Sequence, residues 1–247
     1  MLTACAAAAV AALAYPGGRS PAAAMADAAL TVFLTWALVS ELDPDHPLSA
    51  LLGGVVAGAV AITTGTVSAI ALAVLMLSAR LVTRSTGLRP LITDIAVVGA
   101  VVGALSRTPL VWAAGLAFAF AVALDTGLPE PAPQRNLWLA GAIGLAVTLT
   151  AVLSDALQVS WRMPGATTAA LVAVALALVV TAPNDDLRSV TDFRPVPLHP
   201  ERLRAARLLT AGALVLGTLV GGAALASASW AGWVGLIAAG GGARWSP

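Results

Sequence analysis

The chain has 247 residues, of which 59% are hydrophobic and only 10% are charged, and its formal net charge is +1 at pH 7. Soluble domains carry about 25% charged residues, so this chain is too poor in charge to cover a surface that faces water. The weak net charge predicts no nucleic-acid partner, and the single cysteine, Cys5, excludes an internal disulfide and a CxxC metal or redox site.

Apolar runs separated by glycine, proline and charged residues predict the helices. In chain order they lie at 2–15, 21–40, 48–63, 66–82, 91–106, 109–124, 136–154, 165–182, 207–227 and 229–240. A spanning helix takes about 20 residues, so the first and last runs are short for a span. We expect an all-α polytopic transmembrane bundle of about eight to ten short spans, built of helical hairpins and forming a single integral membrane domain over 1–247.

Short connectors predict which helices lie side by side. The links after 48–63 and after 91–106 hold only a tight turn, so each of these runs is predicted to lie antiparallel beside the next. Gly54–Gly58, Gly99–Gly103 and Gly217–Gly221 match the GxxxG pattern, which favours close helix packing. Tryptophans near the ends of the runs are predicted as interfacial anchors; they are Trp112, Trp138, Trp230, Trp233 and Trp245.

The arginines predict the orientation. If all ten runs cross, one side holds Arg80, Arg84, Arg89, Arg135, Arg188, Arg194, Arg202, Arg204, Arg207 and Arg244, and the other holds Arg19, Arg107 and Arg162. Cytoplasmic loops are enriched in basic residues, so we expect a cytoplasmic N-terminus in the cell (inner) membrane. The segment 183–206 then forms a charged cytoplasmic loop.

A weak internal echo links three of these cytoplasmic loops. Thr86-Gly87-Leu88-Arg89-Pro90 resembles Thr126-Gly127-Leu128-Pro129 about forty residues later, and the loop 42–47 precedes them at a similar interval. This spacing is typical of a repeated parallel two-helix hairpin, although a chance match in a biased composition is the alternative.

Ionisable side chains within the apolar runs are candidate functional groups, because each is costly in a bilayer. Asp27, Thr31 and Thr35 recur at intervals of four residues and predict one polar stripe. The functional interpretation is a site for a proton or cation, and the structural one is a carboxylate at a helix N-terminus. Asp94, with Arg84 or Arg89 as partner, and Asp155, with Arg162, are further candidates that a structural role explains better.

Two acidic loops are candidate metal sites. Glu41, Asp43 and Asp45 alternate beside His46, and carboxylate oxygens suit Mg²⁺ or Ca²⁺. The second group comprises Asp185, Asp186 and Asp192. Its Asn184-Asp185-Asp186 cluster is similar to the aspartate motifs with which UbiA-type membrane prenyltransferases bind a Mg²⁺-diphosphate. The adjacent aspartates depart from that family's spacing and no second motif follows, so membership is not inferred, and no cofactor is expected.

These features leave three functional hypotheses. The leading one is a small permease or channel-like protein for an ion or small metabolite, which makes an enzymatic role the less favoured one. The alternatives are a membrane-embedded enzyme that processes lipid or isoprenoid at an acidic metal site, and a non-catalytic subunit of a larger complex. The expected partners are the lipid bilayer and either a second copy of the chain or another membrane protein.

Overall fold

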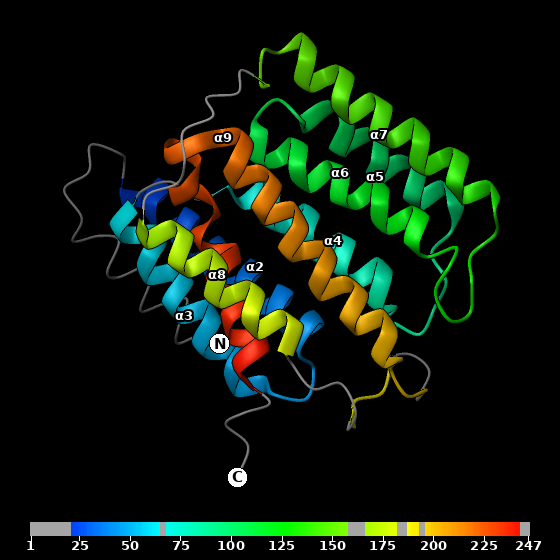
Figure 1. The fold of residues 1–247 in the computed structure, drawn as a ribbon, viewed down its shortest axis with the longest axis horizontal. Helices are drawn as coiled ribbons and strands as arrows, with labels where there is room; N and C mark the ends of the chain where they lie inside the picture. Colours follow the sequence, from blue (N-terminus) through cyan, green and yellow to red (C-terminus); the bar gives the residue numbers. More distant parts are fainter. Residues whose placement is uncertain (1–20, 65–67, 158–165, 182–186, 193–195, 243–247) are drawn as a thin grey trace.

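A computed structural model describes residues 21–64, 68–157, 166–181, 187–192 and 196–242, and this part of the chain is helical (Figure 1). The helices are α2 (Pro21–Leu42), α3 (Pro47–Thr64), α4 (Ala69–Thr83), α5 (Ile92–Leu105), α6 (Pro109–Leu124), α7 (Arg135–Leu153), α8 (Ala166–Thr181) and α9 (Pro200–Gly242). They match the runs predicted from 21 onward to within a few residues, except at α9. The run 2–15 lies outside the described residues.

The ends of the helices follow from local sequence. Proline is the first residue of α2, α3, α6 and α9, where its missing N–H leaves no hydrogen bond unmade. Thr108 caps α6 by accepting a hydrogen bond from the Val111 N–H, and Ser68 caps α4 in the same way through Ala71. Arg84 ends α4 in a left-handed conformation, with φ of 52°.

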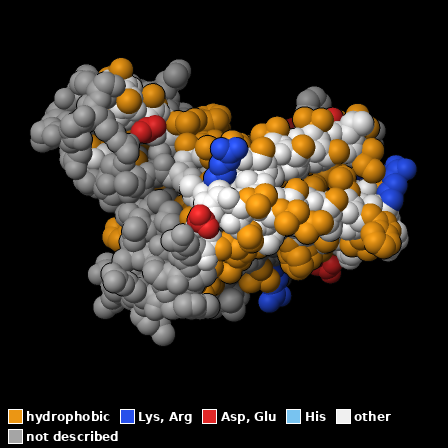
Figure 2. All heavy atoms as spheres, turned by 90° about the horizontal axis from the view of Figure 1, so that it is seen from above, with side chains coloured by type: hydrophobic (Ala, Val, Ile, Leu, Met, Phe, Trp, Pro, Cys, Tyr) orange, Lys and Arg blue, Asp and Glu red, His pale blue; other side chains and the backbone are white. Residues whose placement is uncertain are grey.

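Within the described residues, three helices are long and apolar enough to cross a membrane: Ala22–Leu42, Arg135–Leu153 and Pro200–Val220. The shorter apolar helices are Pro47–Ile62, Ala69–Thr83, Ile92–Leu105 and Pro109–Leu124. On the face shown in Figure 2, hydrophobic side chains cover much of the described surface and charged side chains are few. Length, composition and surface therefore agree on a membrane protein with transmembrane helices.

Helices α2, α4 and α6 form a central row in which each packs against the next. At one side of the row, α3 packs against α2. At the other side, α7 packs against α6, and α5 packs against both α6 and α7. Helix α9 packs across the row, and α8 packs against α9. One predicted pair is wrong, because α3 and α4 do not pack side by side in the described part. The flanks of α3 are taken by α2 and α9, and those of α4 by α2, α6 and α9.

Helix α9 folds back on itself. Its 43 residues would extend about 65 Å if straight. Yet Thr218 Oγ1 lies 3.3 Å from Ser229 Oγ, eleven residues later, where a straight helix would separate them by about 16 Å. The first and second parts of α9 correspond to the predicted runs 207–227 and 229–240. The helix also begins at Pro200, within the segment predicted as a charged loop.

Small residues let the helices approach closely. A Cβ atom at Gly99 of α5 would lie 2.5 Å from Ile143 Cδ1 of α7, and one at Gly217 of α9 would lie 2.8 Å from Leu110 Cδ1 of α6. Both glycines belong to the predicted GxxxG pairs. The prediction for Trp233 is wrong, because its side chain is fully buried and its indole N–H donates to Thr218 Oγ1 at 3.4 Å. It is a core residue at the turn back of α9.

Candidate functional site

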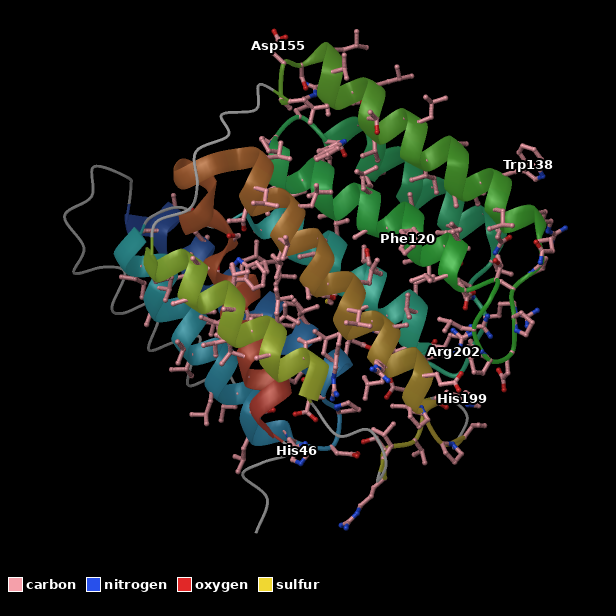
Figure 3. The ribbon with its side chains drawn as sticks, in the orientation of Figure 1. His46, Phe120, Trp138, Asp155, His199 and Arg202 are labelled. Carbon is pink, nitrogen blue, oxygen red and sulfur yellow. The ribbon has the colours of Figure 1, made fainter. Side chains whose placement is uncertain are left out.

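The charged residues gather where α2, α4 and α6 end and α9 begins. We call this region the charged end; His46, His199 and Arg202 mark it in Figure 3, whereas Asp155 lies at the opposite end. The row of parallel helices produces it, since α2, α4 and α6 end at Leu42, Thr83 and Leu124. These intervals of about forty residues are the ones that the loop echo in the sequence indicated.

Asp125 is the centre of the charged end. The Arg84 guanidinium donates to it through two atoms, from Nε to Oδ1 at 3.0 Å and from Nη2 to Oδ2 at 2.9 Å. Arg202 of α9 donates from Nη1 to Asp125 Oδ1 at 2.8 Å. Asp125 and Arg202 are each 1% exposed and Arg84 is 7% exposed. One buried carboxylate therefore joins α4, α6 and α9 through two buried arginines.

Arg202 uses its remaining donors on backbone carbonyls. Nη1 also donates to Val82 O at 2.8 Å, and Nε donates to Pro129 O at 2.9 Å. A guanidinium whose N–H groups all point at acceptors tolerates burial, whereas an isolated buried charge does not. Arg202 thus ties the start of α9 to the end of α4 and to the loop after α6.

A second group surrounds Asp43 at the end of α2. Asp43 Oδ1 lies 2.7 Å from His46 Nδ1, and Asp43 Oδ2 accepts from Ser49 Oγ at 3.3 Å. Arg207 Nη2 of α9 is 3.9 Å from Asp43 Oδ1, and Arg207 Nε donates to Leu42 O at 2.7 Å. Burial raises the pKa of Asp43 above its ordinary value, although His46, Arg207 and Ser49 oppose this effect.

Asp45 holds the loop before α9 against the loop after α2. It accepts hydrogen bonds from the Arg188 N–H at 3.0 Å and the Ser189 N–H at 2.8 Å, and from the Ser189 hydroxyl. Partial burial alone would raise the pKa of Asp45, but these hydrogen bonds outweigh burial and lower it below its ordinary value.

Glu41 completes the charged end on the α4 side. Its carboxylate accepts from Thr83 Oγ1 at 3.2 Å and lies 3.7 Å from Arg80 Nε. Arg80 Nη2 is also 3.5 Å from Asp192, whose side chain is 64% exposed. An arginine or hydroxyl group is thus a partner of each of four carboxylates: Glu41, Asp43, Asp45 and Asp192.

The predicted metal ligands do not converge in the described part of the chain. Glu41, Asp43 and Asp45 bind different protein donors, and the described residues contain no group of three His, Cys, Asp or Glu side chains placed to hold a metal ion. Asp185 and Asp186 lie outside the described residues.

Two cavities open at the charged end and share Arg84 and Arg89. The first, of about 430 Å³, has a polar rim of Arg80, Arg84, Arg89 and Asp94 and apolar walls that include Leu77, Val98 and Phe118. The second, of about 260 Å³, is more polar and is lined by Arg84, Arg89, Arg202, Glu130 and His199, among others. Each cavity is lined by more arginines than carboxylates. Carboxylates nearby pair with three of these arginines, namely Arg80, Arg84 and Arg202. Arg89, which lines both cavities, donates to a backbone carbonyl, Pro131 O, at 3.1 Å.

The candidates within the helices lie in several places. Thr31 and Thr35 are buried, with Thr31 Oγ1 donating to Asp27 O at 2.7 Å, whereas the Asp27 side chain is exposed. Asp94 lies at the rim of the first cavity, but Arg84 pairs with Asp125 and with Glu130, at 3.7 Å, rather than with Asp94. Asp155 is exposed after α7, and its predicted partner Arg162 is outside the described residues.

Sequence reasoning missed Asp125, the most buried carboxylate of the charged end. One available signal was the loop echo, because Arg84 and Asp125 stand just before the two related Thr-Gly-Leu segments. Charges of opposite sign at corresponding places of neighbouring hairpins predict an ion pair. The pairing with Arg202 had no such signal, because it depends on where α9 crosses the row.

Comparison with protein-family models, with curated proteins and with solved structures finds no match to this chain.

Proposed function

We propose that this chain is a multi-pass protein of the cell membrane that acts as a small permease, with its N-terminus and its charged end in the cytoplasm. The observation that carries the proposal is the pair of cavities sharing Arg84 and Arg89, of which one continues from a polar rim to Leu77, Val98 and Phe118 between the helices. A concave site with apolar walls and a few polar groups is typical of a small-molecule site. The loops of the charged end are rich in arginine. This supports a cytoplasmic position for the charged end, because basic residues favour that side of the membrane.

The balance of charges favours a solute with an anionic group. The rim of the first cavity has three arginines and one carboxylate. Carboxylates offset the charge of two of these arginines, since Arg80 pairs with Glu41 and Arg84 pairs with Asp125. Arg89 instead donates to the backbone carbonyl of Pro131, so it is the arginine that supports an anion. A small organic anion with a short apolar part fits both the rim and the walls.

The experiment measures release of a permanently charged probe from liposomes that contain the full-length protein. Hexanesulfonate stays ionised and does not cross lipid unaided, so we expect it to leave proteoliposomes faster than empty liposomes. Methanesulfonate lacks the apolar part and hexyltrimethylammonium carries the opposite charge, so both should leave more slowly. Release of all three probes at the rate of empty liposomes would contradict the proposal.

A matched pair of variants connects the flux to the cavities. Arg89 lines both cavities and is exposed, so Arg89→Gln should slow the release of hexanesulfonate severalfold without disturbing the buried network. Arg107 is an exposed arginine beyond α5, at the opposite end. Arg107→Gln removes the same charge and should leave the rate unchanged.

A further inference from the structure

The cavity of about 430 Å³ lies between two consecutive helices that diverge. It is lined by Leu77, Arg80, Leu81 and Arg84 of the last turns of α4 and by Asp94, Ile95 and Val98 of the first turns of α5, with Phe118 of α6 between them. Helix α5 packs mainly on α6 and α7 rather than along α4, and this divergence leaves the space that the cavity occupies. The cavity therefore has charged groups at its rim and apolar walls from three helices.

Two of the three arginines at this rim already have carboxylate partners. Arg80 Nε lies 3.7 Å from Glu41 Oε1. Arg84 donates to Asp125 through two atoms, and its Nη1 lies 3.7 Å from Glu130 Oε2. Since their positive charges are balanced by carboxylates of the protein, these two arginines add little to the attraction of a solute.

Two charges of opposite sign remain at the same rim. Arg89 donates from Nη2 to the backbone carbonyl of Pro131, and no carboxylate of the described residues lies within ion-pair distance of it. The Asp94 carboxylate, in the first turn of α5, has no hydrogen-bond or ion-pair partner in the described part of the chain. Both side chains are exposed, both residues line the cavity, and no ion pair joins them.

We propose that the solute of this cavity is a zwitterion, namely an α-amino acid with an aliphatic side chain. Its carboxylate pairs with Arg89, its ammonium group pairs with Asp94, and its side chain lies against apolar walls such as Leu77 and Val98. A simple anion leaves Asp94 without a partner, and a simple cation leaves Arg89 without one. This assignment rests on the proposed function, because it names the solute class of the same cavity.

Isothermal titration calorimetry of the full-length protein in detergent at pH 7 tests the assignment. The probes are norleucine, 2-hydroxyhexanoate and glycine. In 2-hydroxyhexanoate a hydroxyl replaces the ammonium group of norleucine, and glycine keeps both charges but lacks the apolar part. Norleucine should bind about tenfold more tightly than either of the other two, because it alone uses both charges and the apolar walls.

Substitutions at the rim separate the two charges. Asp94→Asn should weaken the binding of norleucine about tenfold and should not weaken that of 2-hydroxyhexanoate, which also shows that the variant is folded. Arg89→Gln should weaken the binding of both. Asp155→Asn is the matched control, since it removes an exposed carboxylate at the opposite end and should leave both affinities unchanged.

Equal affinity of the wild-type protein for norleucine and 2-hydroxyhexanoate would overturn the assignment, as would an equal loss of norleucine binding in Asp155→Asn. Phosphatidylethanolamine carries an ammonium and a phosphate group above its acyl chains. If adding it displaces norleucine, the site belongs to a lipid head group and the free amino acid is wrong.

The assignment and the proposed permease can fail separately. Hexanesulfonate has no ammonium group, so its release from proteoliposomes should not be slowed by Asp94→Asn. Release of hexanesulfonate without a preference for norleucine would leave the permease and overturn the zwitterion. Binding of norleucine that depends on Asp94, without release of any probe, would support the zwitterion site and contradict the permease.

Discussion

At the scale of single residues, Asp125 decides whether two arginines are tolerated inside the protein. Arg84 and Arg202 are both buried, and each directs two or more N–H groups at carboxylate or carbonyl oxygens. Replacing a buried ion pair as a whole is often neutral, but removing one partner leaves an uncompensated charge. Asp125 is the shared partner, so its loss affects both arginines at once.

We therefore predict that Asp125→Asn lowers the free energy of unfolding by about 3–5 kcal/mol, because the amide cannot neutralise either guanidinium. The loss should appear as a lower apparent unfolding temperature in detergent, or as failure to purify a folded protein. Asp155→Asn is the matched control, since Asp155 is exposed and its substitution should change stability by no more than about 0.5 kcal/mol. Equal unfolding temperatures for the two variants would contradict a role of Asp125 in holding the arginines.

Asp43 and Asp45 should respond to pH with opposite signs. The pKa of Asp45 is lowered from 3.8, so its stabilising contribution is present above pH 3.8 and is lost as the pH falls through its folded pKa. The pKa of Asp43 is raised from 3.8, so its favourable contribution is present below pH 3.8 and is lost as the pH rises through its folded pKa.

The corresponding variants give a measurable contrast. As the pH rises from 3 to 7, the unfolding temperature of Asp45→Asn should fall relative to the wild type, because the wild type gains its ionised hydrogen-bonded carboxylate. Over the same range that of Asp43→Asn should rise relative to the wild type, because the variant avoids a buried negative charge. Thermal unfolding of the three proteins across this range checks the prediction, and a shift of both variants in one direction would refute it.

At the scale of elements, α5 and α7 are held together by a contact that only glycine allows. A side chain at Gly99 would overlap Ile143. Gly99→Leu should therefore lower the free energy of unfolding by about 1–3 kcal/mol, and adding Ile143→Ala should recover part of the loss. Gly141→Leu is the control on α7, because Gly141 faces open space; a thermal shift as large as that of Gly99→Leu would count against the close approach.

The fold-back of α9 is a second prediction at this scale. In a chain with Cys5 replaced by serine, Thr218→Cys and Ser229→Cys should form a disulfide under mild oxidation, because the two hydroxyl oxygens are 3.3 Å apart. The mass of a fragment from proteolysis between the two positions, with and without reductant, detects the bond. A straight α9 would keep the two cysteines apart and give no cross-link beyond that of either single-cysteine chain.

The helices were largely predictable from the sequence, and their partners were less so. Apolar runs bounded by proline and glycine locate α2 to α8 to within a few residues, because a spanning helix must satisfy its own backbone. Packing depends on which faces fit, and α3 turns away from α4 toward α2 and α9. The fold-back of α9 likewise involves contacts such as Thr218–Ser229. No local sequence pattern indicates such contacts.

The charged end was predictable in part. The acidic residues Glu41, Asp43 and Asp45 were candidates from the sequence, and the arginine distribution predicted that the three loops of the echo lie on one side. Asp125 was not among the candidates, and a single carboxylate after a helix carries no local signal of burial. Its importance comes from two arginines at sequence distances of 41 and 77 residues, which only the folded chain brings to it.

At the scale of the whole molecule, the connections after α2, α4 and α6 and the segment before α9 meet at the charged end. Arg84–Asp125, Arg89–Pro131 and Asp45–Ser189 are contacts between these connections. Such an arrangement requires successive helices to alternate in direction, which is what repeated crossing of a bilayer produces. It also concentrates arginine at one end, and basic residues favour the cytoplasmic side.

Labelling of single cysteines tests both the crossing and its orientation. In a chain with Cys5 replaced by serine, Arg107→Cys and Arg188→Cys each place a thiol at an exposed position, at the opposite end and the charged end respectively. A maleimide that does not cross membranes should label Arg107→Cys in intact cells, and Arg188→Cys only after permeabilisation. The reverse pattern would keep the crossing but invert the orientation, so the arginine excess would then face outward. Labelling of both positions in intact cells would contradict a bundle whose two ends lie on opposite sides of the membrane.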